Sequence, residues 1–155
     1  MDGYKEALSW AAAYCSRSEH CRSEVIKHLE RYELSAAEQS HLLKRLEEEG
    51  YLDELRYARA FVSDQFRFHQ WGRLKIRQGL QLRKISDAVI GEAMTVISES
   101  DYVETLTRLL QAKMKHISAG NTYEMAAKLM RFAYGKGYEI ETVRKCIDIS
   151  ELAST

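Results

Sequence analysis

Two stretches of this chain align with one another without a gap: residues 21–55 (CRSEVIKHLERYELSAAEQSHLLKRLEEEGYLDEL) and residues 72–106 (GRLKIRQGLQLRKISDAVIGEAMTVISESDYVETL). Seven positions are identical, and conservative apolar pairs such as Val25 with Ile76 lie between them at helical spacing. The identical residues of the first copy are Arg22, Leu29, Ser35, Ala37, Glu48, Tyr51 and Leu55. Repeats of this length are typical of arrays of small helical units.

A third and looser copy begins near Tyr123, where the shift is 53 residues. We therefore predict an all-α fold: an elongated, curved array of three tandem three-helix units, over residues 1–51, 52–99 (the central, basic unit) and 100–155. The nine predicted helices cover residues 3–16, 21–32, 36–49, 53–69, 72–83, 86–98, 101–116, 122–134 and 139–147.

Composition favours helices throughout the chain. None of the 155 residues is proline, and β-branched residues nowhere alternate with polar ones. Capping signals recur at Ser35 with Glu38, at Ser86, and at Ser100 with Asp101. Stop signals recur at Gly50 and at residues 135–137. These signals set the predicted helix boundaries.

Composition and charge also exclude several classes of protein. The chain is 45% apolar and has 23 basic and 23 acidic residues, but it has no apolar run of membrane-spanning length. Its first residues lack the apolar stretch of a secretory leader, so we expect none. We expect a soluble, cytoplasmic monomer. Its three cysteines, Cys15, Cys21 and Cys146, form no CxxC pair, so we expect reduced thiols.

No catalytic or cofactor-binding motif occurs in the sequence, so we expect a protein that is not an enzyme, with no catalytic residue, cofactor or metal. Residues 135–137 read as a turn between helices. A zinc site is the weaker reading of Cys15, His20, Cys21 and His28, because their spacing fits no zinc motif. The acidic residues Glu47, Glu48, Glu49, Asp53 and Glu54 suggest a solvated face, or else a contact with basic residues of a neighbouring helix or a partner.

Residues 65–86 contain no acidic side chain, although the whole chain is neutral. The basic residues of this stretch are Arg67, Arg73, Lys75, Arg77, Arg83 and Lys84. Helical spacing turns Ile76 and Leu80 inward and leaves a basic arc exposed. The rings of Phe66, Phe68 and Trp71 are expected to pack on a neighbouring helix, with stacking on nucleic-acid bases as the alternative.

The order of these residues resembles the bacterial RecX family. The matching residues are Asp53, Arg56, Tyr57, Ala58, Phe61 and Val62, then Gly72, Arg73, Ile76, Arg77 and Leu80, then Arg83, Ile85 and Ser86. The chain departs from the family pattern at Gly79, where glutamate is usual, and at Lys84, where glycine is usual at the helix end.

This resemblance implies a regulator of RecA, the recombinase that polymerises on single-stranded DNA. Such proteins lie in the groove of the RecA filament and inhibit its ATPase, strand exchange and co-protease activities, in recombination, repair and the SOS response. We expect the six basic residues of the 65–86 stretch to bind the filament or its DNA, with Arg56 and Arg59 as further candidates. The alternative is a stand-alone DNA-binding module that uses the basic central helix.

Overall fold

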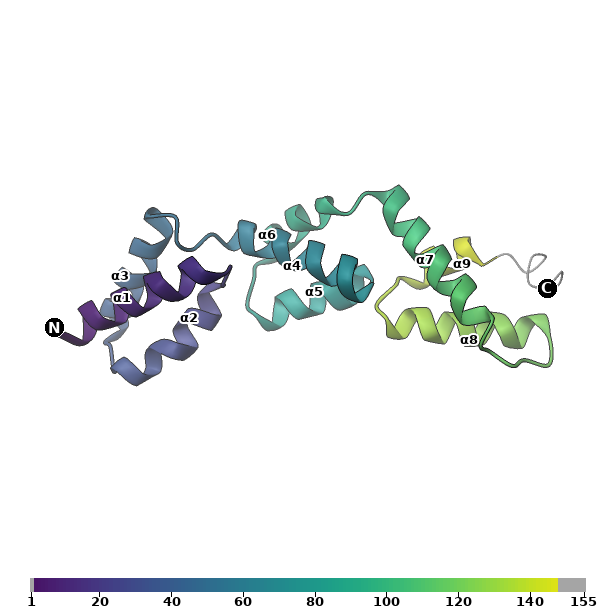
Figure 1. Cartoon of the computed structure of the whole chain (residues 1–155), viewed down its shortest axis with the longest axis horizontal. Helices are drawn as coiled ribbons and strands as arrows, with labels where there is room; N and C mark the ends of the chain where they lie inside the picture. Colours follow the sequence, from purple (N-terminus) through teal and green to yellow (C-terminus); the bar gives the residue numbers. More distant parts are fainter. Residues whose placement is uncertain (1, 148–155) are drawn as a thin grey trace. The chain divides into compact units, whose positions relative to one another are not determined.

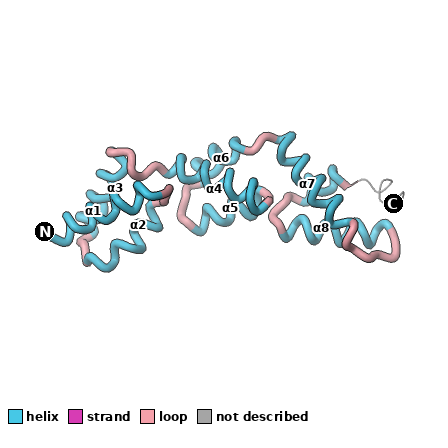
Figure 2. The backbone as a smooth tube through the Cα atoms, viewed as in Figure 1, coloured by secondary structure: helices cyan, strands magenta, loops and turns pink. Residues whose placement is uncertain are grey.

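The structure is a computed structural model that describes residues 2–147, and within them every regular element is a helix (Figures 1 and 2). The all-α prediction is confirmed. The α-helices are α1 (Asp2–Arg17), α2 (Arg22–Leu29), α3 (Ala36–Glu48), α4 (Glu54–His69), α5 (Arg73–Leu82), α6 (Asp87–Ala93), α7 (Glu99–Met114), α8 (Thr122–Gly135) and α9 (Ile140–Cys146). Two short 3₁₀ turns, Glu30–Tyr32 and Met94–Val96, extend α2 and α6.

Polar side chains begin several helices as the sequence predicts. The Ser35 hydroxyl accepts a hydrogen bond from the Glu38 amide, and the Glu38 carboxylate accepts one from the Ser35 amide, which completes a capping box. At α7 the predicted start was wrong by two residues. Ser98, rather than Ser100, is the N-cap, because its hydroxyl accepts from the Asp101 amide at 3.1 Å.

The contacts divide the chain into two compact units. Unit 1 comprises Met1–Phe61 and Leu80–Ala93, and unit 2 comprises Val62–Gly79 and Met94–Thr155. The division cuts through α4 and α5, so each of these helices contributes residues to both units. It therefore differs from the division into sequence repeats.

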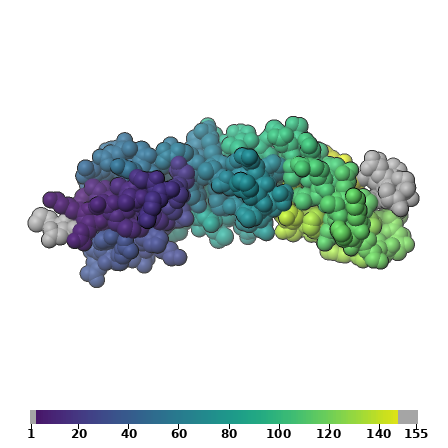
Figure 3. Space-filling model, viewed as in Figure 1, coloured from purple at the N-terminus to yellow at the C-terminus, as the bar shows by residue number. Residues whose placement is uncertain are grey.

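Unit 1 has a core formed by small and branched apolar side chains. Ala7 and Ala11 of α1 are fully buried, and they allow the close approach of α1 to α3. Val25, Leu42 and Leu46 are also fully buried in the same cluster. Helix α1 covers the face of unit 1 that is turned toward the viewer in Figure 3.

Unit 2 is centred on two buried tyrosines. Helix α7 contacts both α8 and α9 (Figure 1). Tyr102 on α7 and Tyr138 before α9 are fully buried. The rings of Tyr102 and Tyr138 lie 5.1 Å apart, and the ring of Phe66 from α4 lies 6.0 Å from Tyr102. These aromatic contacts join the second half of α4 to the last three helices.

The sequence repeat reappears as a repeated turn. Glu33, Lys84 and Gly137 follow the second helix of their repeats, and their φ angles are 52°, 61° and 99°. Left-handed backbone favours glycine, yet two of the three positions carry side chains. Lys84 thus adopts the left-handed conformation that Gly137 adopts in the third repeat.

Candidate partner-binding surfaces

The eight basic residues predicted to bind a partner are divided between the two units. Unit 2 holds Arg67, Arg73, Lys75 and Arg77, and unit 1 holds Arg56, Arg59, Arg83 and Lys84. Each group is therefore a separate candidate surface. Its members differ in whether they form ion pairs and hydrogen bonds with other residues of the same unit.

Arg73 is committed to contacts inside unit 2. Its guanidinium donates to Glu99 at 2.6 Å and to Glu139 at 3.2 Å, and it lies 3.7 Å from the ring centroid of Tyr102. The Tyr102 hydroxyl accepts from the Arg73 amide at 2.9 Å and donates to the other Glu139 oxygen. Burial raises the pKa of the Tyr102 hydroxyl, so it keeps the proton that it donates. Arg73 therefore joins α5 to α7 and to the start of α9.

The other three predicted binding residues of unit 2 have no carboxylate partner among the described residues: Arg67, Lys75 and Arg77. The Lys75 ammonium lies 4.7 Å from the Trp71 ring centroid, and the Arg67 guanidinium lies 5.8 Å from the Phe68 ring. Contacts with aromatic faces leave the positive charge available to a partner. These three residues form the free basic set of unit 2.

The predicted orientation of α5 is confirmed, whereas that of one aromatic ring is not. Ile76 and Leu80 are fully buried, and Leu82 is exposed. Phe66 is buried, but Phe68 is 68% exposed. Two residues apart on a helix, side chains point to nearly opposite sides, so the expectation that both rings pack in the core was wrong for Phe68.

The unit 1 candidates mostly make contacts within that unit. Arg56 donates to Glu19 at 2.6 Å and to the Gly50 carbonyl at 3.1 Å. The Arg83 guanidinium lies 4.8 Å from the Phe61 ring, and Arg59 lies 3.9 Å from a Glu92 oxygen. Arg56 thus holds the segment before α4, which is a structural role.

Lys84 is exposed, and within the described residues it makes no ion pair. Its position on the left-handed turn fixes the backbone but leaves the side chain in solvent. Of the unit 1 group, Lys84 is the cation with its charge most available.

The acidic residues near α3 and α4 meet basic groups of the same unit. Glu47 pairs with Arg22, and Glu49 lies 3.4 Å from Arg45. One oxygen of Glu54 accepts from the Arg22 amide at 2.9 Å, and the other is buried without a hydrogen-bond partner. Burial raises the pKa of Glu54. Contact with a neighbouring helix is therefore correct for Glu47 and Glu54, which meet Arg22 of α2. Glu48, Glu49 and Asp53 are exposed, as a solvated face predicts.

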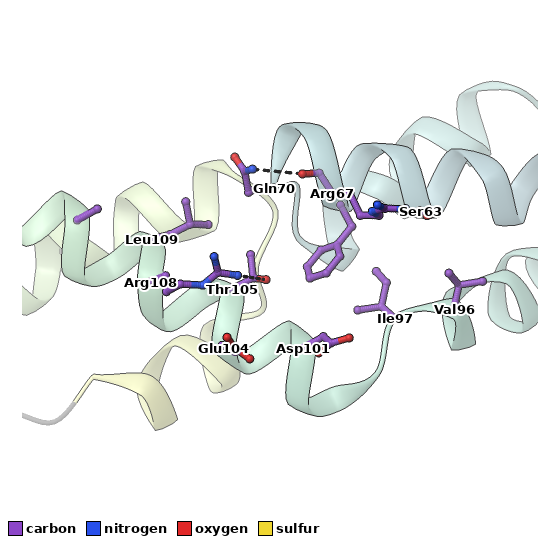
Figure 4. Close-up of a pocket in the computed structure, with 12 residues that line it drawn as sticks. Ser63, Arg67, Gln70, Val96, Ile97, Asp101, Glu104, Thr105, Arg108 and Leu109 are labelled. Carbon is purple, nitrogen blue, oxygen red and sulfur yellow. Dashed lines mark hydrogen bonds between the residues drawn. The ribbon is translucent and has the colours of Figure 1, made fainter.

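Unit 2 also contains an open cleft of about 600 Å³ between α4 and α7 (Figure 4). Ser63, Phe66, Arg67 and Gln70 of α4 form one wall. The other wall comes from α7, and Val96 and Ile97 close one end. The α7 residues are Asp101, Glu104, Thr105, Arg108, Leu109 and Ala112.

The cleft brings Arg67 together with Arg108, a basic residue that sequence reasoning missed. On α7 the lining residues recur at intervals of three and four, so they share one face of the helix. That spacing was the available signal. In the sequence alone, a face with Asp101, Glu104 and Arg108 looks like an ordinary solvated surface, because α4 comes close only in the fold.

The candidate metal ligands of the sequence include two of the cysteines, Cys15 and Cys21. Within residues 2–147, no group of three histidine, cysteine or acidic side chains is placed to hold a metal ion. Cys15 and Cys21 are buried, and burial raises the pKa of the Cys15 thiol to about 11. Over the same residues, every helix is too short or too polar to cross a bilayer.

Comparison with protein families gives two matches. The pattern described as RecX, second three-helix domain, matches residues 53–94. The pattern described as RecX, third three-helix domain, matches residues 99–147.

Individual relatives cover most of the chain. A "Regulatory protein RecX" from Chlorobium phaeobacteroides is 30% identical over 93% of both chains. One from Prosthecochloris aestuarii is 27% identical, again over 93% of both. One from Bacillus mycoides is 24% identical over 93% of this chain but only 53% of its own length.

Two solved structures share the fold. The crystal structure of RecX from Lactobacillus salivarius has a TM-score of 0.85 at 19% identity and covers 99% of both chains. A crystal structure of a regulatory protein RecX has a TM-score of 0.84 at 20% identity, over 94% of this chain and 73% of the other.

Proposed function

Because this chain belongs to the RecX family of regulatory proteins, we propose that it regulates the recombinase RecA. In this proposal it binds as a monomer along the RecA filament on single-stranded DNA. Binding inhibits ATP hydrolysis, strand exchange and co-protease activity, and the regulator itself catalyses no reaction.

The observation that carries the proposal is family membership together with the free basic set of unit 2. Arg67, Lys75 and Arg77 have positive charges that no carboxylate of the described residues neutralises. A filament that contains DNA presents phosphates, and acidic protein surfaces attract the same cations. Lys84 in unit 1 adds a further exposed charge.

The proposed mechanism is a shift between filament states. A ligand changes such an equilibrium only through its different affinities for the two states. In this proposal the three-helix units contact successive RecA protomers, so that one bound chain biases several of them. The expected signature is inhibition without any change in the ATP-binding site of RecA.

The test is an assay of RecA ATPase activity on single-stranded DNA, with the DNA in excess. The wild-type chain is expected to inhibit, and excess DNA is expected not to relieve the inhibition. The variant Lys75→Glu/Arg77→Glu should need about tenfold more protein for the same inhibition, because two attractive charges become repulsive. A matched control, Lys27→Glu/Lys44→Glu, reverses two exposed charges of unit 1 and should inhibit like the wild type.

The alternative function, a stand-alone DNA-binding module, is favoured by the absence of acidic residues from 65 to 86. Relief of inhibition by excess DNA would support this alternative and contradict the filament proposal. The module would also bind DNA without RecA, with an affinity that falls steeply as salt rises. No inhibition of RecA by the wild-type chain at any DNA concentration would refute the proposed function.

A further inference from the structure

The residues that line the cleft of unit 2 have the same spacing on both of its helices, α4 and α7. On α4 the lining residues are spaced by three, one and three positions, and on α7 they continue the same pattern over three turns (Figure 4). The residues within each wall therefore lie along a single helix face. A surface whose spacing suits helix contact is therefore left open over about 600 Å³.

The apolar residues of the cleft are together called its floor: Phe66 on the α4 wall, Leu109 on the α7 wall, and Val96 and Ile97 at one end. Phe66 and Ile97 are 9% and 7% exposed. Val96 at one end is 45% exposed, and Leu109 on α7 is half-buried. An apolar side chain placed here would cover Val96 and Leu109 and would lose its own contact with water.

The rim of the cleft carries charges of both signs. Arg67 lies on the α4 wall, and Arg108 lies on the α7 wall, where its guanidinium is 3.4 Å from the Thr105 hydroxyl. Asp101 and Glu104 lie on the same α7 face, and both are exposed. Neither acid makes an ion pair within residues 2–147, so two negative and two positive groups stand open around one apolar floor.

We propose that this cleft binds a polypeptide segment of the RecA partner, one that carries an apolar side chain flanked by residues of both charges. The proposal rests on the proposed function and names the part of the partner that this cleft receives. The apolar side chain occupies the floor at Phe66 and Val96. An acidic residue of the segment pairs with Arg67 and Arg108, and a basic residue pairs with Asp101 and Glu104.

Charge decides between polypeptide and nucleic acid as the occupant. A nucleic-acid backbone is uniformly negative, so in this cleft its phosphates would lie against Asp101 and Glu104 as well as against the arginines. Like charges at short range oppose binding, whereas a segment with both signs satisfies the whole rim. The cleft is thus assigned to protein, and the free cations Lys75 and Arg77 on α5 stay available for phosphates.

The experiment neutralises the two signs separately. The variants Arg67→Gln/Arg108→Gln and Asp101→Asn/Glu104→Gln are compared with the wild type for binding to RecA filaments, using fluorescence anisotropy of the labelled chain. Both double variants are expected to bind the filaments about fivefold or more weakly. If nucleic acid occupied the cleft, the acid-neutralised variant would instead bind more tightly, and this outcome would overturn the proposal.

Matched controls separate charge from folding. Lys44→Gln and Glu48→Gln neutralise exposed residues of α3 in unit 1, and both should bind like the wild type. Melting temperatures of all variants show whether unit 2 still folds. A third cleft variant, Val96→Asp, keeps every rim charge and should also weaken binding, because it places a carboxylate at the apolar floor.

The outcomes also distinguish this proposal from the proposed function. A wild-type chain that binds and inhibits RecA, together with cleft variants that do so equally well, would refute the cleft proposal alone. A wild-type chain with no effect on RecA would refute both, and the Lys75→Glu/Arg77→Glu variant would then also show no difference.

Discussion

Helices α2 and α5 begin at equivalent positions of the repeat, but different chemistry anchors their first turns. In unit 1 the Arg22 amide donates to a carboxylate oxygen of Glu54 at 2.9 Å. In unit 2 the Arg73 amide donates to the Tyr102 hydroxyl, also at 2.9 Å. A half-buried acid and a buried phenol thus satisfy the same free amide of a helix N-terminus.

We call the contacts that hold the first turn of α2 and of α5 the unit 1 anchor and the unit 2 anchor. Each anchor has a second contact, which is made by a side chain in unit 1 and by the backbone in unit 2. The Ser23 hydroxyl donates to the Arg83 carbonyl at 2.8 Å, so unit 1 uses a side chain to reach the turn before α6. In unit 2 the Gly72 amide donates directly to the Lys136 carbonyl at 2.7 Å, and the Leu74 amide donates to Gly137 at 2.9 Å. Direct contact between backbones requires that no side chain stands between them.

The comparison shows that the equivalent first turns of α2 and α5 are fixed by a flexible contact in one unit and by a rigid contact in the other. A side chain such as Ser23 can adjust to small changes in spacing, whereas two backbones in contact cannot. A Cβ atom on Gly72 would lie 2.3 Å from the Gly137 carbonyl carbon. The unit 2 anchor therefore depends on two glycines, and the unit 1 anchor depends on none.

The largest expected effect comes from Gly72→Ala. The added methyl group would overlap backbone atoms that cannot move aside, so we expect a loss of about 3 kcal/mol or more in the free energy of unfolding. Urea denaturation measures this change. Gly91→Ala on α6 is the control, because no atom lies within 4 Å of its new Cβ and alanine favours helix, so stability should rise by about 0.5 to 1 kcal/mol. Equal, small effects of both substitutions would contradict the rigid anchor.

A smaller effect is expected from removing the arginine of each anchor. Arg73→Met leaves Glu99 and Glu139 without their shared cation and should cost about 1 to 2 kcal/mol in unfolding free energy. Arg22→Met removes an exposed pair with Glu47 and should cost less than about 1 kcal/mol. Chemical denaturation of the two variants in parallel gives both values. A greater loss at Arg22 would reverse the ranking of the anchors.

The repeated left-handed turn gives a third comparison. Lys84 has φ 61° and Glu33 has φ 52°, a conformation that costs residues with a side chain about 1 kcal/mol relative to glycine. Lys84→Gly and Glu33→Gly are therefore expected to raise the melting temperature slightly. Lys84→Ala serves as a control that removes the charge but keeps the strain, and it should not be stabilising. If Lys84→Ala stabilised the chain as much as Lys84→Gly, charge rather than backbone would be the cause.

The smallest expected effect is a difference in pH dependence between the anchors. Because burial raises the folded-state pKa of Glu54, ionisation of this carboxyl opposes folding as pH rises through that pKa. Glu54→Gln should therefore be more stable than the wild type at neutral pH, and the difference should disappear in acid, where Glu54 is protonated. Unfolding curves measured across the acid range test this. Tyr138→Phe should give a difference from the wild type that is constant over the same range, because the Tyr138 hydroxyl donates to the Gln70 backbone carbonyl and burial raises its pKa further above that range.

The helices and their buried faces could be predicted because they depend on residues close in sequence. Ser35 and Glu38 set one helix start, and Ile76 and Leu80 set the buried side of α5. The repeat added the tandem arrangement of similar units. All of these signals have periods of three, four or about fifty residues, and they can be read along the chain.

The candidate site was harder to predict because charge partners are remote in sequence. Arg73 looked like a free cation among neighbours without acids, but its partners Glu99 and Glu139 lie 26 and 66 residues away. Arg108 was missed for the converse reason: it lies outside the basic stretch and joins Arg67 only across a cleft. Local sequence predicts which charges exist, and the fold determines which remain available.

Helices α4 and α5 each belong to two compact units, and this has a consequence for how the protein can be taken apart. A fragment of residues 53–94 would follow the family pattern but would separate Glu54 from Arg22 and Gly72 from Gly137. In such a fragment the helix ends would lose these contacts and core side chains would be exposed to water. We therefore expect it to lack fixed tertiary packing. The sequence repeats therefore do not coincide with the parts of the chain that we expect to fold on their own.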